Sequence, residues 1–294
     1  MAQLALRLEA NVDGDFFVDS SCIDCDACRI FAPSVFHDAG GQSAVHHQPA
    51  SREELLAAQK ALVSCPTASI GSVGKHDVKP ALAALPELVA EDVYRCGYTS
   101  ESSFGAISYF VQREDGNILI DSPRFATQLV QNIAARGKLR TMLLTHRDDV
   151  ADHEQYFARF GCVRVLHHDD VTANTRAVEL QPAGLEPIDL GRQMVMIPTP
   201  GHTPGHAVFL YRNRFLFTGD HLAWSERHGH LYAFRSACWY SWSEQILSME
   251  RLLDYEFEWV LPGHGRPMHL PADEMRASLI RCIAWMKTTQ AKSK

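Results

Sequence analysis

The residues from His146 to His153 are the part of this chain best suited to chemistry. Two histidines and three aspartates fall within eight residues, directly after the apolar run Met142 to Leu144. Ionisable groups at the end of a buried strand are costly unless they bind a metal, form pairs or transfer protons. The stretch therefore predicts metal ligands or acid–base groups.

Three later segments repeat the same residue types after apolar runs. They are Gly-His202-Thr-Pro-Gly-His206, Thr-Gly-Asp220-His221 and Pro-Gly-His264-Gly. A single cluster would be unremarkable, but four in one chain predict one assembled site.

A second site is predicted from cysteines. Cys22, Cys25 and Cys28 form a Cys-x2-Cys-x2-Cys run, and Cys65-Pro66 follows at a distance. This spacing is typical of a [4Fe-4S] cluster, with Cys65 as the fourth ligand because no second run is present. Residues 15–72 resemble a bacterial-type ferredoxin with a single cluster. A structural zinc site is the alternative, although zinc motifs usually come as two cysteine pairs.

The cluster implies electron transfer, with a purely structural cluster as the alternative. Five acidic residues between Asp13 and Asp26 would disfavour reduction and would suit a basic electron-transfer partner. The remaining cysteines are expected to be buried apolar residues. These are Cys96, Cys162, Cys238 and Cys282.

The histidine and aspartate segments, together with Asp121, resemble the five motifs of the metallo-β-lactamase-like hydrolases. The resemblance covers residues 90–270, and the segment Pro200 to His206 is similar to the glyoxalase II branch. It implies an α+β chain, with a small ferredoxin-like domain followed by a four-layer αββα sandwich. It also implies a dinuclear metal site at one edge of the sheets.

The resemblance further implies a role for each motif residue. His146 and His202 would bind the first metal, and Asp220 would bridge the two metals. Asp152, His153 and His264 would bind the second metal. Asp152 would also be catalytic, by orienting a nucleophilic water, and Asp121 would support the ligand loops. Two such metals suit the hydrolysis of an ester, thioester or amide.

The chain departs from the family at its second motif, which is usually His-x-His-x-Asp-His. Asp148 stands where the second histidine is expected, and two extra residues precede Asp152. Asp148 is the predicted ligand, Asp149 is the alternative, and a weak first site with one metal is a third possibility. A carboxylate shifts the preference from zinc towards iron or manganese. The expected cofactors are a [4Fe-4S] cluster and one or two divalent metals, zinc or iron. In this respect Asp148 resembles the flavodiiron branch of the same superfamily, in which a glutamate takes the place of the second histidine.

Other polar residues are expected to be less important. His206 is predicted to be a packed supporting residue and His221 to point away. The run from His167 to Asp170 is predicted to be a solvated loop, and His228 and His230 are expected at the surface. Four aromatic residues either line a pocket or pack normally. They are Trp224, Trp239, Tyr240 and Trp242.

Composition and residue patterns predict the domains, helices and strands that must position these groups. We expect a ferredoxin-like domain at 1–75, a flexible polar linker at 76–89 and a metallo-β-lactamase-like domain at 90–294. A capping box at Ser51 to Glu54 predicts a helix over 55–63 that leads to Cys65. Further helices are predicted at 125–135, 153–160, 243–253 and 274–286. Strands are predicted at 106–111, 118–120, 142–144, 163–166, 195–197, 208–211, 215–217 and 259–261.

The whole chain narrows the function classes. A net charge of −7 argues against binding to nucleic acid or an anionic membrane. No apolar run approaches the ~20 residues that span a bilayer, and the N-terminus is a poor signal peptide. We therefore expect a cytoplasmic protein with reduced cysteines and a small-molecule substrate.

Three functions follow from these residues. The first is a metal-dependent hydrolase with a fused iron–sulfur redox or sensor domain. The second is an iron-dependent redox enzyme for oxygen, nitric oxide or sulfur compounds, in which the cluster supplies electrons. The third is an electron-transfer or sensor protein whose hydrolase part is a degenerate binding module.

Overall fold

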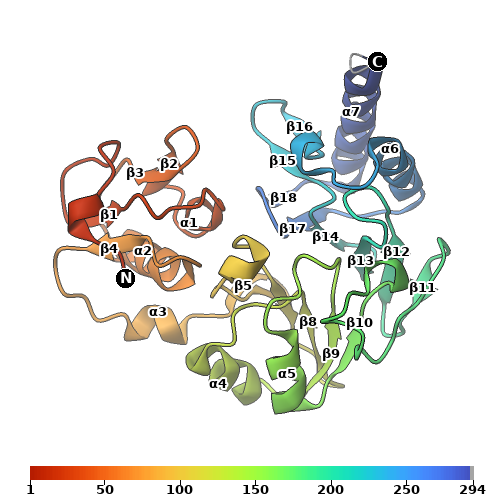
Figure 1. Ribbon diagram of the computed structural model, residues 1–294, viewed down its shortest axis with the longest axis horizontal. Helices are drawn as coiled ribbons and strands as arrows, with labels where there is room; N and C mark the ends of the chain where they lie inside the picture. Colours follow the sequence, from red (N-terminus) through yellow and green to blue (C-terminus); the bar gives the residue numbers. More distant parts are fainter. Residues whose placement is uncertain (292–294) are drawn as a thin grey trace. The chain divides into compact units, whose positions relative to one another are not determined.

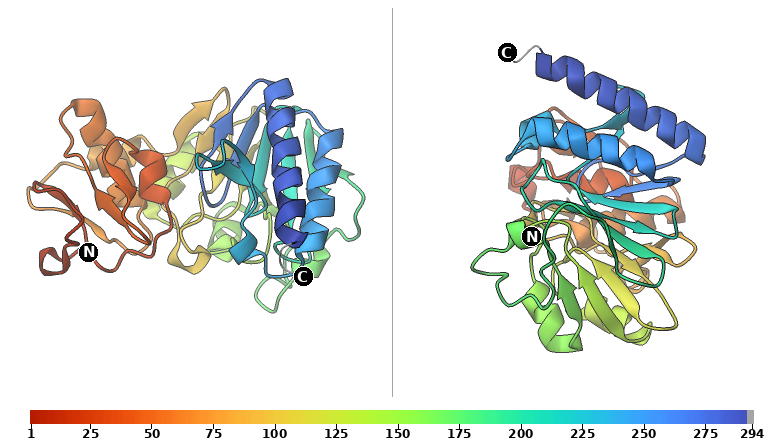
Figure 2. Two further views of the ribbon diagram at one scale, coloured as in Figure 1. Left: turned by 90° about the horizontal axis from the view of Figure 1, so that it is seen from above. Right: turned by 90° about the vertical axis from the view of Figure 1, so that its right-hand side faces the viewer.

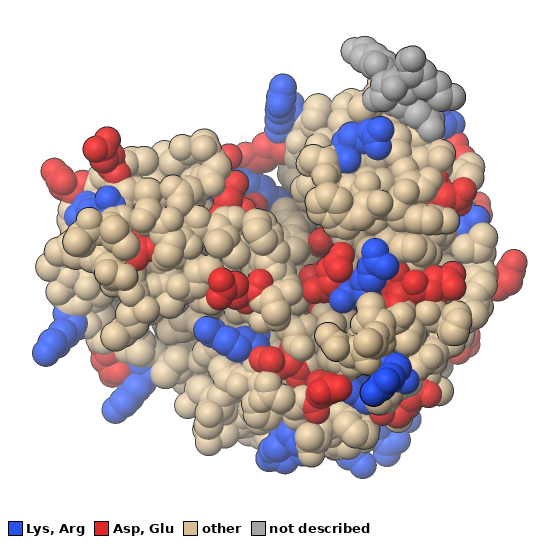
Figure 3. Space-filling model, in the orientation of Figure 1, with Lys and Arg blue, Asp and Glu red and all other residues tan. Residues whose placement is uncertain are grey.

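The computed structural model describes residues 1–291, and the chain divides into two compact units (Figure 1). Unit 1 holds Met1–Thr141 and Ala151–Cys162, and unit 2 holds Met142–Val150 and the chain from Val163 onward. On the face drawn in Figure 3, acidic and basic side chains are interspersed. No helix within residues 1–291 is long and apolar enough to cross a membrane.

Unit 1 begins with the cysteine-bearing segment. The strand β1 (Phe16–Val18) pairs with β4 (Ile70–Ser72), and β2 (Phe36–Asp38) pairs with β3 (Ser43–Val45), both antiparallel. A 3-10 turn covers Leu4–Leu6, and α1 (Ala27–Phe31) packs against α2 (Arg52–Ser64). The capping box is confirmed, since Ser51 accepts from Glu54 N and Glu54 accepts from Ser51 N. It fixes the start of the helix that delivers Cys65.

The rest of unit 1 is a sheet with helices. Its strands β5 (Glu87–Ala90), β6 (Val93–Arg95), β7 (Tyr109–Val111) and β8 (Asn117–Ile120) are antiparallel neighbours. The six-stranded sheet has the order β10-β9-β8-β7-β6-β5; β9 is Leu139–Leu143, and β10 is Val163–Val165, which is counted with unit 2. A 3-10 turn covers Glu101–Ser103, and the predicted helices are α4 (Thr127–Ala135) and α5 (His153–Phe160).

The predicted linker at 76–89 has regular structure. It contains α3 (Lys79–Ala83) and the start of β5. Asn132 Nδ2 donates to the carbonyl oxygens of Leu82 and Leu85 at 2.9 and 2.6 Å. These bonds tie the segment to α4, so it is not a free tether. The domain boundary at 75–90 stays a prediction.

Unit 2 has a six-stranded sheet in the order β11-β12-β13-β14-β17-β18. The strands are Ile188–Asp189, Met194–Pro198, Ala207–Tyr211, Phe215–Gly219, Trp259–Pro262 and Met268–His269. Only β14 and β17 are parallel among these described pairs. A hairpin joins β15 (Ala223–Ser225) and β16 (His230–Tyr232). Short 3-10 turns cover His168–Asp170, Arg235–Ala237 and Leu252–Asp254.

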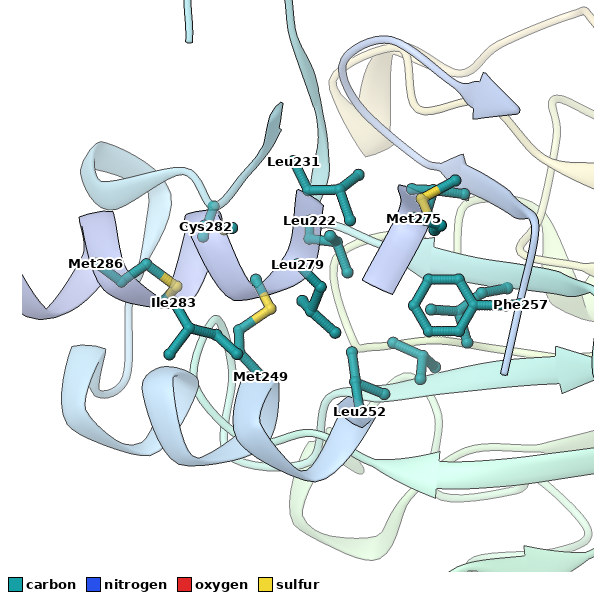
Figure 4. Close-up of a cluster of buried hydrophobic side chains, with 14 of the residues drawn as sticks. Leu222, Leu231, Met249, Leu252, Phe257, Met275, Leu279, Cys282, Ile283 and Met286 are labelled. Atoms are coloured by element: carbon teal, nitrogen blue, oxygen red, sulfur yellow. The ribbon is translucent and has the colours of Figure 1, made fainter. Parts of the chain in front are cut away.

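Two helices cover one core of unit 2. Figure 2 shows α6 (Trp242–Arg251) and α7 (Ala272–Ala291) side by side, and they contact each other. Met249 of α6 meets Leu279 and Ile283 of α7 over the sheet (Figure 4). Each fully buried Leu or Ile side chain contributes about 1.5–3 kcal/mol of burial free energy. This packing holds the strands whose ends carry the predicted ligands.

Candidate metal centres

The predicted ligands of unit 2 come from the ends of strands. His146 and Asp148 follow β9, His202 lies between β12 and β13, Asp220 follows β14 and His264 follows β17. Because β14 and β17 are parallel neighbours, Asp220 and His264 leave the sheet at the same edge.

Two imidazoles face two carboxylates at this edge. His146 Nε2 lies 3.9 Å from Asp148 Oδ2 and 3.8 Å from Asp220 Oδ2. His202 Nε2 lies 3.6 and 3.7 Å from the same two oxygens. Ligand atoms that are each about 2.0–2.2 Å from one ion are separated by such distances. Both Nε2 atoms are buried and have no hydrogen-bond partner among residues 1–291, so this donor set fits a metal ion.

A second group forms on the other oxygen of Asp220. Asp220 Oδ1 lies 2.7 Å from His264 Nδ1. A Cβ on Gly263 would be 2.8 Å from Asp149 Oδ2 and 3.1 Å from Asp220 Oδ1, so only glycine permits this approach. His146, Asp149 and Asp220 also form a group whose ligand atoms lie within 4.8 Å of one another. The structure thus brings both Asp148 and Asp149 to the site.

The charge states suit metal binding. Burial lowers the pKa of His146 to about 4, which leaves the neutral imidazole that binds metals. Burial would raise the pKa of Asp220, but His264, His146 and His202 together hold it well below its usual range. Asp220 is therefore an anion, the protonation state that a carboxylate metal ligand needs.

Asp152 and His153 begin α5 in unit 1. The Asp152 carboxylate accepts hydrogen bonds from Phe125 N at 2.7 Å and from Gln155 Nε2 at 2.9 Å. His153 is buried, and Asp121 is buried at the end of β8. The metal-binding roles of Asp152 and His153, and the catalytic role of Asp152, stay predictions.

Asp170 corrects the prediction that residues 167–170 are a solvated loop. His167 and Asp170 are buried, and only His168 and Asp169 are exposed. Asp170 accepts hydrogen bonds from Arg147 N at 3.0 Å, Thr203 Oγ1 at 2.5 Å and Gly205 N at 2.8 Å. It therefore joins the loop of His146 to the loop of His202. No sequence motif marks this role, because it depends on the fold of unit 2.

His206 and His221 extend the row of rings from the ligands into the core. The ring centroids of His146 and His206 are 5.1 Å apart, and those of His206 and His221 are 5.5 Å apart. His206 is packed as predicted, and its Nδ1 lies 3.0 Å from Thr199 Oγ1. Burial lowers the pKa of His221 to about 3, so its ring stays neutral.

The other histidines and aromatic residues of unit 2 differ in exposure. His228 and His230 are partly exposed, and His228 stacks on Tyr232 with ring centroids 5.4 Å apart. Trp242 is buried in the core. Trp239 is exposed, and its backbone N–H donates to His202 O at 3.0 Å. An exposed aromatic ring is thus anchored beside a metal-ligand candidate.

The cysteine site lies in unit 1. Cys22, Cys25, Cys28 and Cys65 line one cavity. Ser43 N donates to Cys22 Sγ at 3.4 Å, and Ser69 N donates to Cys65 Sγ at 3.3 Å. Burial raises the pKa of Cys25 to about 12, so a metal must displace its proton. Convergent thiols with backbone donors aimed at sulfur fit an iron–sulfur cluster.

The remaining cysteines and the nearby acids are also placed. Cys96, Cys162 and Cys282 are buried as predicted, whereas Cys238 is half-buried and donates to Gly201 O at 3.2 Å. Asp24 and Asp38 pair with the buried Arg29 at 2.8 and 3.4 Å, and Asp26 pairs with it as well. The buried Arg29 therefore neutralises part of the negative charge near the cysteine loop.

Comparison with known proteins places the cysteine segment. Residues 18–72 match the family model described as the 4Fe-4S single cluster domain of Ferredoxin I. The match spans Cys22, Cys25, Cys28 and Cys65, and it favours the cluster over structural zinc.

Solved structures place the remainder. The DIM-1 metallo-β-lactamase exposed to ceftazidime has a TM-score of 0.51 and 18% identity, covering 69% of this chain and 96% of that one. A metallo-β-lactamase from Pontibacter korlensis has a TM-score of 0.51 and 17% identity, covering 68% and 97%. The chain joins a single-cluster ferredoxin-type segment to a metallo-β-lactamase fold. The predicted α+β class and the fused architecture are confirmed.

A curated relative adds similarity in sequence. A hydroxyacylglutathione hydrolase from Acidiphilium cryptum is 32% identical over 118 residues, which is 39% of this chain and 48% of that protein. The chain thus spans about half the length of the curated relative that it matches. A hydrolase is thus similar in sequence to part of this chain.

Proposed function

We propose that this chain is a metal-dependent hydrolase of a small ester, thioester or amide-type substrate. The cluster would serve as a redox or sensor accessory. The carrying observation is that the two buried Nε2 atoms of His146 and His202 lie 3.6–3.9 Å from oxygens of Asp148 and Asp220. The partial similarity to a hydroxyacylglutathione hydrolase supports a thioester as the first substrate class to test.

The ligand assignment follows from the two oxygens of Asp220. His146, Asp148 and His202 would hold the first metal with Asp220 Oδ2, and His264 would hold the second with Asp220 Oδ1. Asp149 is a further ligand for the second metal, beside the predicted Asp152 and His153. When bound, two divalent ions supply a nucleophilic hydroxide at neutral pH and polarise the substrate carbonyl oxygen. The neutral imidazoles and the Asp220 anion are the protonation states that this binding requires.

The test begins with anaerobic purification and elemental analysis. Zinc or another divalent metal beyond the cluster iron is expected, with hydrolysis of hydroxyacylglutathione or a related acyl thioester. Asp220→Ala should abolish that hydrolysis, whereas Asp169→Ala, an exposed aspartate, should not. A fully metallated protein that hydrolyses no thioester, lactam or phosphodiester would count against the proposal.

Asp148 favours one second candidate, an iron-dependent redox enzyme. A carboxylate facing His146 and His202 in place of an imidazole is a harder ligand and suits iron. Five or six irons per chain without zinc, and reduction of the second site after reduction of the cluster, would support this candidate. Zinc at the second site would exclude it.

The proposal also covers the cellular location and the partners of the protein. We place the protein in the cytoplasm, where its cysteines stay reduced or metal-bound, with a small-molecule substrate and a separate electron-transfer partner. The net charge of −7 supports neither a nucleic-acid nor a membrane partner.

A further inference from the structure

The cysteine site has a neighbour outside the ferredoxin-type segment. Gly105 lies in the loop between the 3-10 turn Glu101–Ser103 and β7. A Cβ at Gly105 would be 2.5 Å from Cys25 Cβ, 2.7 Å from Cys25 Sγ and 3.2 Å from Pro66 Cγ. Real Cβ atoms essentially never approach closer than 3.0 Å, so a side chain here must displace Cys25. The φ of +84° at Gly105 also favours glycine.

The end of α2 that precedes Cys65 is fixed by hydrogen bonds from Thr99 and Arg124. Thr99 N and Thr99 Oγ1 donate to Ser64 O at 3.1 and 2.8 Å. Arg124 Nη2 donates to Val63 O at 3.1 Å. These carbonyls belong to the last turn of α2, where no partner is available within the helix. Residues 99 and 124 therefore fix the direction in which Cys65 leaves α2.

Further contacts join the two parts of unit 1. The Arg95 guanidinium lies over the Phe31 ring, 4.4 Å from its centroid, and Nη1 donates to Ile30 O at 3.4 Å. Lys60 of α2 pairs with Glu87 of β5 at 2.7 Å. The ferredoxin-type segment is thus packed against the first strands of the metallo-β-lactamase fold, rather than tethered to them.

We propose that the loop Thr99–Ala106 completes the iron–sulfur site. Gly105 is a positioning residue for Cys25, and Thr99 is a positioning residue for Cys65. The loop covers the Cys25 side of the site, and solvent access and sulfur geometry are among the factors that set a cluster's potential. The cluster's stability and potential therefore depend on residues of the metallo-β-lactamase fold, whatever reaction that fold catalyses.

The decisive experiment compares two glycine substitutions in the full chain. Gly105→Ala places a methyl group against Cys25, whereas Gly40→Ala has a similar φ of +87° and open space around it. The two glycines have similar φ values, so the comparison isolates the contact with Cys25. Iron and acid-labile sulfide per chain, the paramagnetic spectrum of the reduced cluster and its midpoint potential are the measurements.

We expect Gly105→Ala to lose cluster or to shift the midpoint potential measurably, whereas Gly40→Ala should match the unsubstituted protein in both. A full cluster with unchanged spectrum and potential in Gly105→Ala would overturn the proposal. If Gly105→Ala does not fold, Thr99→Val decides, because it removes one donor to Ser64 O at nearly constant size. It should lose cluster several-fold faster to a chelator than Ser102→Ala, on the same loop. Equal rates would then overturn the proposal.

Discussion

Asp170 is a residue whose role depends on three donors from the two ligand loops. Its carboxylate accepts from Arg147 N, Thr203 Oγ1 and Gly205 N. Each hydrogen bond to a buried charged group contributes about 1.5–3 kcal/mol. Supporting residues of this kind typically change metal affinity 10–100-fold.

We therefore predict that Asp170→Asn weakens metal binding in unit 2 by about 10–100-fold. It should also lower the free energy of unfolding by about 2 kcal/mol, because an amide nitrogen replaces one acceptor. Metal titration and thermal unfolding measure the two effects. Asp169→Asn is the control, since that neighbour is exposed. Equal metal affinity in the two variants would contradict the role given to Asp170.

We also predict that Arg29 influences the midpoint potential of the cluster. Its buried guanidinium pairs with Asp24, Asp26 and Asp38 beside the cysteine loop. Arg29→Gln removes one positive charge and leaves these carboxylates, so an added electron on the cluster becomes less favourable. The midpoint potential should fall by tens of millivolts. Arg52→Gln makes the same change in net charge at an exposed position of α2 and should leave the potential nearly unchanged.

Some residues of the candidate site can be predicted from the sequence and others cannot. His146, His202, Asp220 and His264 are visible because each follows an apolar run in a spaced motif, and the structure brings them together. The choice between Asp148 and Asp149 depends on the path of the loop, and both reach the site. Asp170 belongs to no motif, because its partners at Thr203 and Gly205 are more than 30 residues away.

Helix α2 is an element whose start was visible in the sequence. Ser51 and Glu54 satisfy each other's backbone N–H groups at its first turn, and the helix ends just before Cys65. We predict that Ser51→Ala lowers the free energy of unfolding of unit 1 by about 1 kcal/mol. The cluster content should stay unchanged, because the last turn is held separately by Thr99 and Arg124. Denaturant unfolding measures the loss, with the exposed Ser34→Ala as the control; a loss no larger than that control's would contradict the cap's role.

The longer elements were predictable and several short ones were not. The helices α4 and α5 match because their apolar residues recur at the helical period and a glycine follows each. The strands β12, β13 and β14 match because they are buried, apart from the partly exposed Val195, and contain continuous apolar runs. In contrast, the sequence analysis predicts neither β5, which begins inside the predicted linker 76–89, nor β6, and neither strand is buried throughout. Their strand structure comes from pairing, which local sequence does not show.

At the scale of the whole molecule, the sequence boundary and the compact units differ. The motifs divide the chain near residue 75, because cysteine and histidine chemistry separate there. The contacts instead place the cysteine segment with residues up to Thr141 in unit 1. Packing such as Arg95 on Phe31 and Thr99 on Ser64 joins what composition separates.

The two metal centres share no ligand, and we predict that they load independently. The cluster would use four cysteines of unit 1, and the second centre would use His146, Asp148, His202, Asp220 and His264 of unit 2 together with the predicted Asp152 and His153, which belong to unit 1. Cys28→Ala should remove about four irons per chain and all acid-labile sulfide while the second metal remains. His202→Ala should lower the second metal and leave sulfide unchanged. Elemental and sulfide analysis of anaerobic preparations measures both. Loss of both centres in either folded variant would show that assembly of one requires the other.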